Sequence, residues 1–128
     1  MSHHLNSNSD KATQYFKRSL ILESNHAPTH YNLAYIYTEM DSNELALKHA
    51  WKAYSKYKYI NYKNDAGQMT GSILGKLGRH EEAISILLDC DRLIPGTYHT
   101  YYYLLNSFLH LKKTQEALIT AENMFALD

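Results

Sequence analysis

The residues best able to do chemistry in this sequence are its one cysteine and eight histidines. A cysteine becomes a nucleophile when a base lies beside it, and a histidine can serve as that base or bind a metal ion. Cys90, however, occupies the place that Ala53 holds in a sequence repeat described below, where a small buried residue is expected. Because a buried free cysteine behaves as a small hydrophobic residue, we expect Cys90 to pack in the core.

His26 and His30 have the i, i+4 spacing of two metal ligands on one helix face. Pro28 lies between them, disfavours a helical Ala27 and marks a helix start, so the two rings need not share a face. The chain contains neither an HExxH motif nor a cluster of cysteines and histidines with zinc-ligand spacing. We therefore predict no metal site and no cofactor.

Two short stretches resemble catalytic motifs without completing them. GSILGKLG, residues 71–78, has three residues between its first two glycines where a phosphate-binding loop has four, and Leu77 follows Lys76 where that loop has Ser or Thr. RHEEA, residues 79–83, places a histidine beside two carboxylates, but acidic residues in the first turn of a helix complement its dipole without any catalysis. The sequence therefore predicts no catalytic residues and no enzyme.

Composition and charge narrow the function classes further. The chain of 128 residues is 45% apolar and balances 13 basic against 13 acidic residues, whereas nucleic-acid-binding proteins are usually basic. We predict no nucleic-acid partner, although the basic and aromatic stretch at 53–65 keeps that function as a remote alternative. Without a secretory signal or an apolar run of about 18 residues, we expect a cytoplasmic protein with no membrane partner.

A repeat runs through the chain. The segments 30–54, 67–91 and 101–125 align with offsets of 37 and 34 residues. The aligned sets are Leu33/Thr70/Leu104, Ala34/Gly71/Leu105, Tyr37/Leu74/Phe108, Ala46/Ala83/Ala117 and Ala53/Cys90/Met124. The chain also contains no valine, one of the commonest strand residues, which favours an all-helical structure.

These positions resemble the tetratricopeptide repeat (TPR) family, whose unit is a helix–turn–helix of 34 residues. The first unit carries His30-x-x-Leu33-Ala34-x-x-Tyr37, and small residues follow at the family's spacing in its second helix. The resemblance implies an all-α solenoid, a right-handed superhelix of about seven helices and roughly 3.5 repeats. Gly67 stands where a large aromatic residue is usual, so we expect the first helix of the second unit to pack loosely.

We expect residues 1–9 to be a disordered polar N-terminus and residues 10–128 to form a single TPR domain. The domain divides into a half repeat at 10–26 and full repeats at 27–63, 64–97 and 98–128. Helices are predicted near 10–24, 27–40, 43–62, 64–77, 80–94, 97–111 and 114–127. The three extra residues of the first repeat fall within 53–65, where we expect its second helix to be longer by about one turn.

In TPR proteins the first helix of each unit lines a concave groove, so the resemblance also implies a binding site. The implied peptide-binding residues are Tyr31, Tyr35, Thr38, Glu39, Asp65, Gln68, Ser72, Lys76, His99, Tyr102, Tyr103, Asn106 and His110. Within the tyrosine-rich run at 98–103, we expect Tyr101 in the core, Tyr102 in the groove and Tyr103 near its rim. The lysines, asparagines and arginine with which one TPR subclass grips the acidic C-terminal tail of chaperones are missing, so such a tail is not the expected partner.

A groove rich in tyrosine and histidine offers broad amphipathic contact to an extended peptide. We therefore predict a non-catalytic protein–protein interaction module that binds a peptide or protein segment, as an adaptor, as a scaffold or as part of a larger TPR protein. The alternative is a small cytoplasmic chaperone of secretion substrates that resembles the three-TPR class. An unpaired first helix and an uncapped last helix also lead us to consider homo-oligomers formed through the ends of the array.

Overall fold

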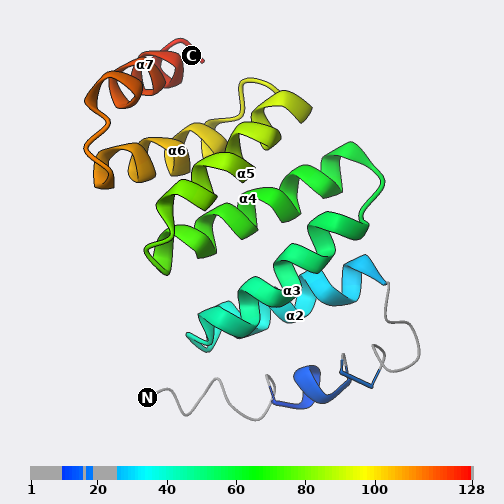
Figure 1. Cartoon of the computed structure of the whole chain (residues 1–128). Helices are drawn as coiled ribbons and strands as arrows, with labels where there is room; N and C mark the ends of the chain where they lie inside the picture. The colour runs from blue at the N-terminus through cyan, green and yellow to red at the C-terminus, as the bar shows by residue number, and fades with distance from the viewer. Residues whose placement is uncertain (1–9, 16, 19–25, 128) are drawn as a thin grey trace.

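The computed structural model describes residues 10–15, 17–18 and 26–127, and these ranges contain helices and turns but no strand. Residues 10–15 and 17–18 are helical. Six longer helices follow: α2 (Ala27–Glu39), α3 (Asn43–Lys56), α4 (Ile60–Lys76), α5 (His80–Leu93), α6 (Tyr98–His110) and α7 (Thr114–Phe125). They form antiparallel pairs, α2 with α3, α4 with α5 and α6 with α7, stacked in chain order (Figure 1). This arrangement confirms the predicted all-α solenoid.

The predicted polar segment at 1–9 and the later part of the helix predicted at 10–24 lie outside the described residues.

The turn inside each helix pair has the same backbone geometry. Asp41, Gly78 and Lys112 all have a left-handed backbone, with φ of 58°, 80° and 60°. The residue after each donates its backbone N–H to a carbonyl in the last turn of the preceding helix, at 2.8–2.9 Å, which satisfies an end group that the helix itself leaves unpaired. These three positions are 37 and 34 residues apart, so the backbone follows the register of the sequence repeat.

The helices of the central pair approach each other unusually closely. A Cβ atom on Gly67 would lie 2.4 Å from the Cys90 Sγ, and one on Gly71 would lie 2.6 Å from the Leu87 Cγ. Thr70, on the same helix, is completely buried, and its hydroxyl donates to the Ala66 carbonyl at 2.8 Å. The expectation of loose packing around Gly67 is therefore wrong, because the missing side chain is replaced by the neighbouring helix itself.

The connection between the first two full repeats also differs from the prediction. The chain is not helical through residue 62: α3 ends at Lys56, Tyr57 has an extended backbone (φ −63°, ψ 135°), and α4 already begins at Ile60. The extra residues therefore lengthen α4 at its start. Lys63 holds this geometry, because its Nζ donates to the Tyr54 carbonyl at 2.6 Å and lies 4.3 Å from the centre of the Tyr54 ring.

The first pair is held together by a stack of buried rings. The Nδ1 atoms of His30 on α2 and His49 on α3 lie 3.0 Å apart, and the His49 ring also stacks on Tyr37 with 5.7 Å between ring centres. Both histidines are buried. Burial, followed by the charges of His30 and the nearby lysines, lowers the pKa of His49 from 6.5 to about 4. The His49 imidazole is therefore a neutral core group at neutral pH, and His30 is turned toward α3 while His26 is exposed at the start of α2.

The glycine contacts give a first prediction. We expect Gly71→Ala to lower the free energy of unfolding by about 1–2 kcal/mol. The clash of the new methyl group with the fully buried Leu87 costs more than the higher helix propensity of alanine contributes. Gly75→Ala is the matched control on the same helix. Its Cβ would meet no atom nearer than 3.9 Å, so we expect the free energy of unfolding to rise by up to about 1 kcal/mol. Urea unfolding of the two variants measures both values, and equal stabilisation by both would contradict the close approach.

The buried histidine pair gives a second prediction. In the unfolded chain His49 binds a proton below pH 6.5, whereas in the folded protein it does so only near pH 4. The stability is therefore complete above pH 6.5 and is lost progressively as the pH falls toward 4, by as much as about 3 kcal/mol. Urea unfolding across this range, compared with His49→Gln, measures the contribution of this one ring. The prediction fails if the variant keeps the full pH dependence of the parent.

Candidate functional site

A groove of about 340 Å³ lies on the face formed by the first helices of the three pairs, α2, α4 and α6. We call it the first-helix groove. Its lining side chains recur every three or four residues, the spacing that places residues on one helix face. They are Tyr31, Tyr35 and Thr38 from α2, Asp65, Gln68, Met69, Ser72, Ile73 and Lys76 from α4, and His99 and Tyr103 from α6.

Contacts between helices fix the walls of this groove. The Gln68 Nε2 donates to the Thr100 Oγ1 at 2.9 Å and so joins α4 directly to α6. On the α2 wall, the Tyr31 ring packs edge-on against Tyr57 from the turn after α3, with 6.4 Å between ring centres. The Thr38 hydroxyl donates to the Ala34 carbonyl of its own helix at 2.8 Å. The walls are therefore positioned by neighbouring helices before any ligand binds.

Nine of the thirteen residues predicted for the binding site line this groove. They are Tyr31, Tyr35, Thr38, Asp65, Gln68, Ser72, Lys76, His99 and Tyr103. Met69 and Ile73 also line it and were missed, since apolar residues at these places read as core from the sequence alone. Ile73 is only 1% exposed and belongs to the core beneath the groove, so the accessible apolar surface comes from the partly buried Met69.

The other four predicted residues do not line the groove. Glu39 is exposed at the end of α2. Tyr102 is 51% exposed and stacks on Tyr98, one ring away from the groove residue Tyr103. Asn106 and His110 lie further along α6, where the His110 Nδ1 donates to the Asn106 carbonyl at 2.9 Å. Tyr101, predicted to be core, is partly buried and packs against the cluster that contains Leu104 and Phe108.

Tyr31 and Tyr57 remain uncharged at neutral pH. Burial, followed by the charges of Asp65 and Tyr35, raises the pKa of Tyr31 above 10. Burial also raises the pKa of Tyr57, with a smaller contribution from Tyr31. Neutral phenols can donate hydrogen bonds through their hydroxyl groups and present apolar ring faces. Formal charge in the groove therefore comes from Asp65 and Lys76 alone when His99 is neutral.

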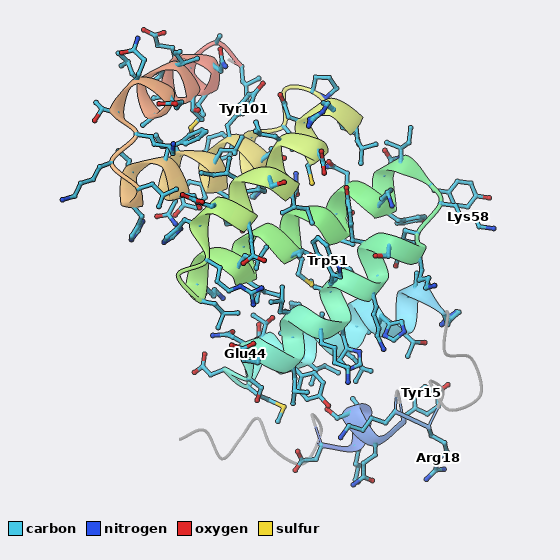
Figure 2. All side chains as sticks on the ribbon, in the orientation of Figure 1. Tyr15, Arg18, Glu44, Trp51, Lys58 and Tyr101 are labelled. Carbon is cyan, nitrogen blue, oxygen red and sulfur yellow. The ribbon has the colours of Figure 1, made fainter. Side chains whose placement is uncertain are left out.

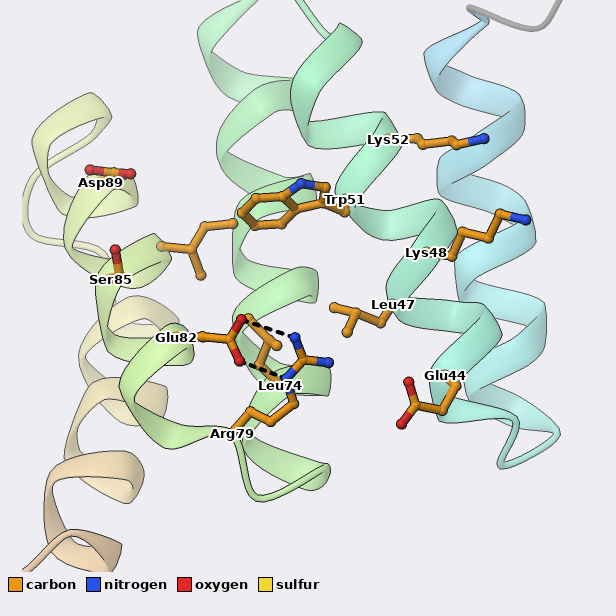
Figure 3. Close-up of a pocket in the computed structure, with 11 residues that line it drawn as sticks. Glu44, Leu47, Lys48, Trp51, Lys52, Leu74, Arg79, Glu82, Ser85 and Asp89 are labelled. Atoms are coloured by element: carbon orange, nitrogen blue, oxygen red, sulfur yellow. Dashed lines mark hydrogen bonds and ion pairs between the residues drawn. The ribbon is translucent and has the colours of Figure 1, made fainter.

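A larger groove, of about 610 Å³, lies on the face formed by the second helices α3 and α5 (Figure 3). Leu47, Leu74 and Ile86 supply apolar side chains, and the Trp51 ring extends from α3 toward α5. The Arg79 guanidinium pairs with both Glu82 oxygens, at 2.6 and 2.9 Å, beside this groove. We call it the second-helix groove.

Sequence reasoning did not identify the second-helix groove. The signal was present: Trp51, the only tryptophan of the chain, continues the helical stripe of Glu44 and Lys48 on α3. Trp51 is 49% exposed, and Figure 2 shows it on the side of α3 that faces α5.

The described residues offer little for covalent or metal chemistry. Cys90 is completely buried, and burial, followed by the nearby aspartates, raises the pKa of its thiol to about 12. The His80 Nδ1 lies 3.0 Å from the Ser107 Oγ, but Ser107 is only 1% exposed and a substrate cannot reach it. Within the ranges that the structure describes, no three His, Cys, Asp or Glu side chains are grouped to hold a metal ion, and no helix is long and apolar enough to cross a membrane.

Comparison with known proteins agrees with this fold. Residues 68–97 match the family model described as tetratricopeptide repeat. A crystal structure of MamA superposes on 93% of this chain with a TM-score of 0.85 and 18% identity, and a second MamA structure, from AMB-1, does so on 93% with 0.83 and 24%. YrrB, described as a TPR protein with an unusual peptide-binding site, superposes on 94% with 0.83 and 19%.

At these identities the likeness shows a shared fold. The chain covers 68%, 63% and 61% of the lengths of the three solved chains. No curated protein matches the chain significantly in sequence.

The burial of Cys90 gives a third prediction. Because the thiolate is the reactive form and the thiol is buried, we expect the folded protein to react with iodoacetamide at least about a hundredfold more slowly than the unfolded protein at the same pH. Mass spectrometry with and without urea measures the two rates. Rapid labelling of the folded protein would show that Cys90 is accessible and reactive.

Proposed function

Because the chain is a solenoid built from tetratricopeptide repeats, we propose that it is a non-catalytic interaction module that binds a protein or peptide segment in the first-helix groove. The observation that carries the proposal is the convergence of nine expected binding residues, from three helices far apart in sequence, on one preformed groove. The general role in protein interaction agrees with the repeat match at 68–97. The assignment of this particular groove is our proposal.

The composition of the groove suits an extended peptide. Tyr35 is 55% exposed, so its ring is available to pack on a ligand at small entropic cost. The partly buried Met69 favours an apolar side chain, while Gln68 and Ser72 beside it can bond to peptide groups. YrrB, which shares the fold, is likewise described as having a peptide-binding site.

A fourth prediction tests this assignment. Peptides are first selected by the immobilised protein from a display library of random sequences, and the tightest are synthesised with a fluorescent label. We expect Tyr35→Ala to weaken their binding about tenfold, equivalent to about 1.4 kcal/mol, because it removes a broad contact from the groove wall. Fluorescence anisotropy gives Kd for each variant.

Tyr98→Ala is the matched control. Tyr98 is 53% exposed, nearly as much as Tyr35, but it does not line the groove. We expect its replacement to leave Kd unchanged, and both variants to keep the thermal unfolding midpoint of the parent. If no peptide is selected, or if the selected peptides bind equally well after Tyr35→Ala, the proposed site is wrong.

A further inference from the structure

The first-helix groove carries one full charge of each sign on α4. Asp65 lies in the second turn of the helix and Lys76 is its last residue, and both line the groove. They are eleven positions apart, which corresponds to about 16 Å along the helix axis. A groove ligand that extends along α4 therefore meets a negative group at one end and a positive group at the other.

Asp65 is exposed in the groove without a cation of its own. None of the described residues forms an ion pair with it. Lys63, two residues earlier, is turned away, since its Nζ bonds to the Tyr54 carbonyl. The same groove is lined by Tyr31, whose ring packs edge-on against Tyr57. A carboxylate beside tyrosine rings is the combination that holds a lysine or arginine side chain, through an ion pair and cation–π contact.

Lys76 is likewise without an anionic partner among the described residues. Arg79, the next basic residue along the chain, is already paired with Glu82 at 2.6 Å on the other face of the array. An ammonium group at the end of a groove attracts a carboxylate of the ligand, and it does so most strongly when no carboxylate of the protein neutralises it.

Building on the proposed function, we infer that the groove selects a bipolar segment: an extended peptide with a lysine or arginine beside Asp65 and an aspartate or glutamate beside Lys76. In an extended chain each residue advances about 3.3 Å, so the two charges of the ligand are about five residues apart. A hydrophobic residue between them faces Met69 in the groove. The groove thus selects the signs and the spacing of two charges as well as shape.

The test changes the sign of one charge of the groove. The variant Asp65→Lys leaves a positive group at both charged positions, in whichever direction the peptide runs. Peptides are selected from the random display library separately by the parent and by the variant. We expect the parent to enrich peptides with a basic and an acidic residue about five positions apart, and the variant to enrich peptides with two acidic residues at that spacing.

Binding constants give the second measurement. A labelled peptide selected by the parent is expected to bind Asp65→Lys about tenfold more weakly, because an attraction becomes a repulsion, and the loss should shrink at high salt. The matched control is Glu122→Lys, which makes the same change of charge at an exposed residue outside the groove and should leave Kd unchanged. Thermal unfolding confirms that each variant is folded.

The outcomes separate this inference from the function on which it rests. If peptides are selected and Tyr35→Ala weakens them, but no pair of opposite charges is enriched and Asp65→Lys changes nothing, the bipolar ligand is wrong and the peptide groove stands. If no peptide is selected, or Tyr35→Ala has no effect, the groove assignment falls and the inference with it. Enrichment of uniformly acidic or uniformly basic peptides by the parent also overturns the bipolar ligand.

Discussion

The close contact between α4 and α5 is the constraint on which the rest of the structure depends. α4 is the only described helix that packs against α3, α5 and α6. It can do so because Gly67 and Gly71 leave no side chains on the surface where Cys90 and Leu87 of α5 press against it. A helix pair of this size cannot bury its apolar face alone, so the central pair supplies surfaces to both neighbours. A larger residue at either glycine would push α5 outward and disturb the contacts of the first and the last pair together.

The same packing decides which side of α4 lines the first-helix groove. Gly67, Gly71 and Leu74 lie on the buried face that is turned to α5 and the core. The polar groove residues of this helix lie roughly 90–170° further round it, and they are Asp65, Gln68, Ser72 and Lys76. Gln68 then bonds to Thr100, so the distance between α4 and α6 is held by a polar contact at the base of the groove. The width of the groove therefore depends on the core packing on the other side of α4. This is why the groove is preformed without a ligand.

The repeat could be predicted from the sequence because small and large side chains recur at regular positions. Small side chains at Ala34, Gly71, Ala46 and Ala83, with large ones a turn away, specify both helix pairing and register, and the left-handed turns at Asp41, Gly78 and Lys112 keep the same offsets. The end of α3 could not be predicted, since it depends on Lys63 reaching back nine residues to the Tyr54 carbonyl, a contact that no local propensity encodes. The packing at Gly67 was mistaken for the same reason: whether a missing side chain leaves a gap or admits a neighbour is decided by the helix opposite.

The predicted residues of α2 and α4 lie in the groove except Glu39, whereas on α6 only His99 and Tyr103 do, because there the angular position of a few residues decides the outcome. Tyr102 and Tyr103 are consecutive, so their side chains point about 100° apart, and only Tyr103 reaches the groove. The two grooves of the protein also differ in their charged residues. Arg79 and Glu82 line the larger second-helix groove as a bidentate pair, and Glu44, Lys48 and Lys52 line it without an ion pair among the described residues. The smaller first-helix groove has only one full charge of each sign, on Asp65 and Lys76, and neither is paired among the described residues. Unpaired charges in a groove can be satisfied by a ligand. The bipolar peptide proposed above satisfies both charges of the smaller groove at once.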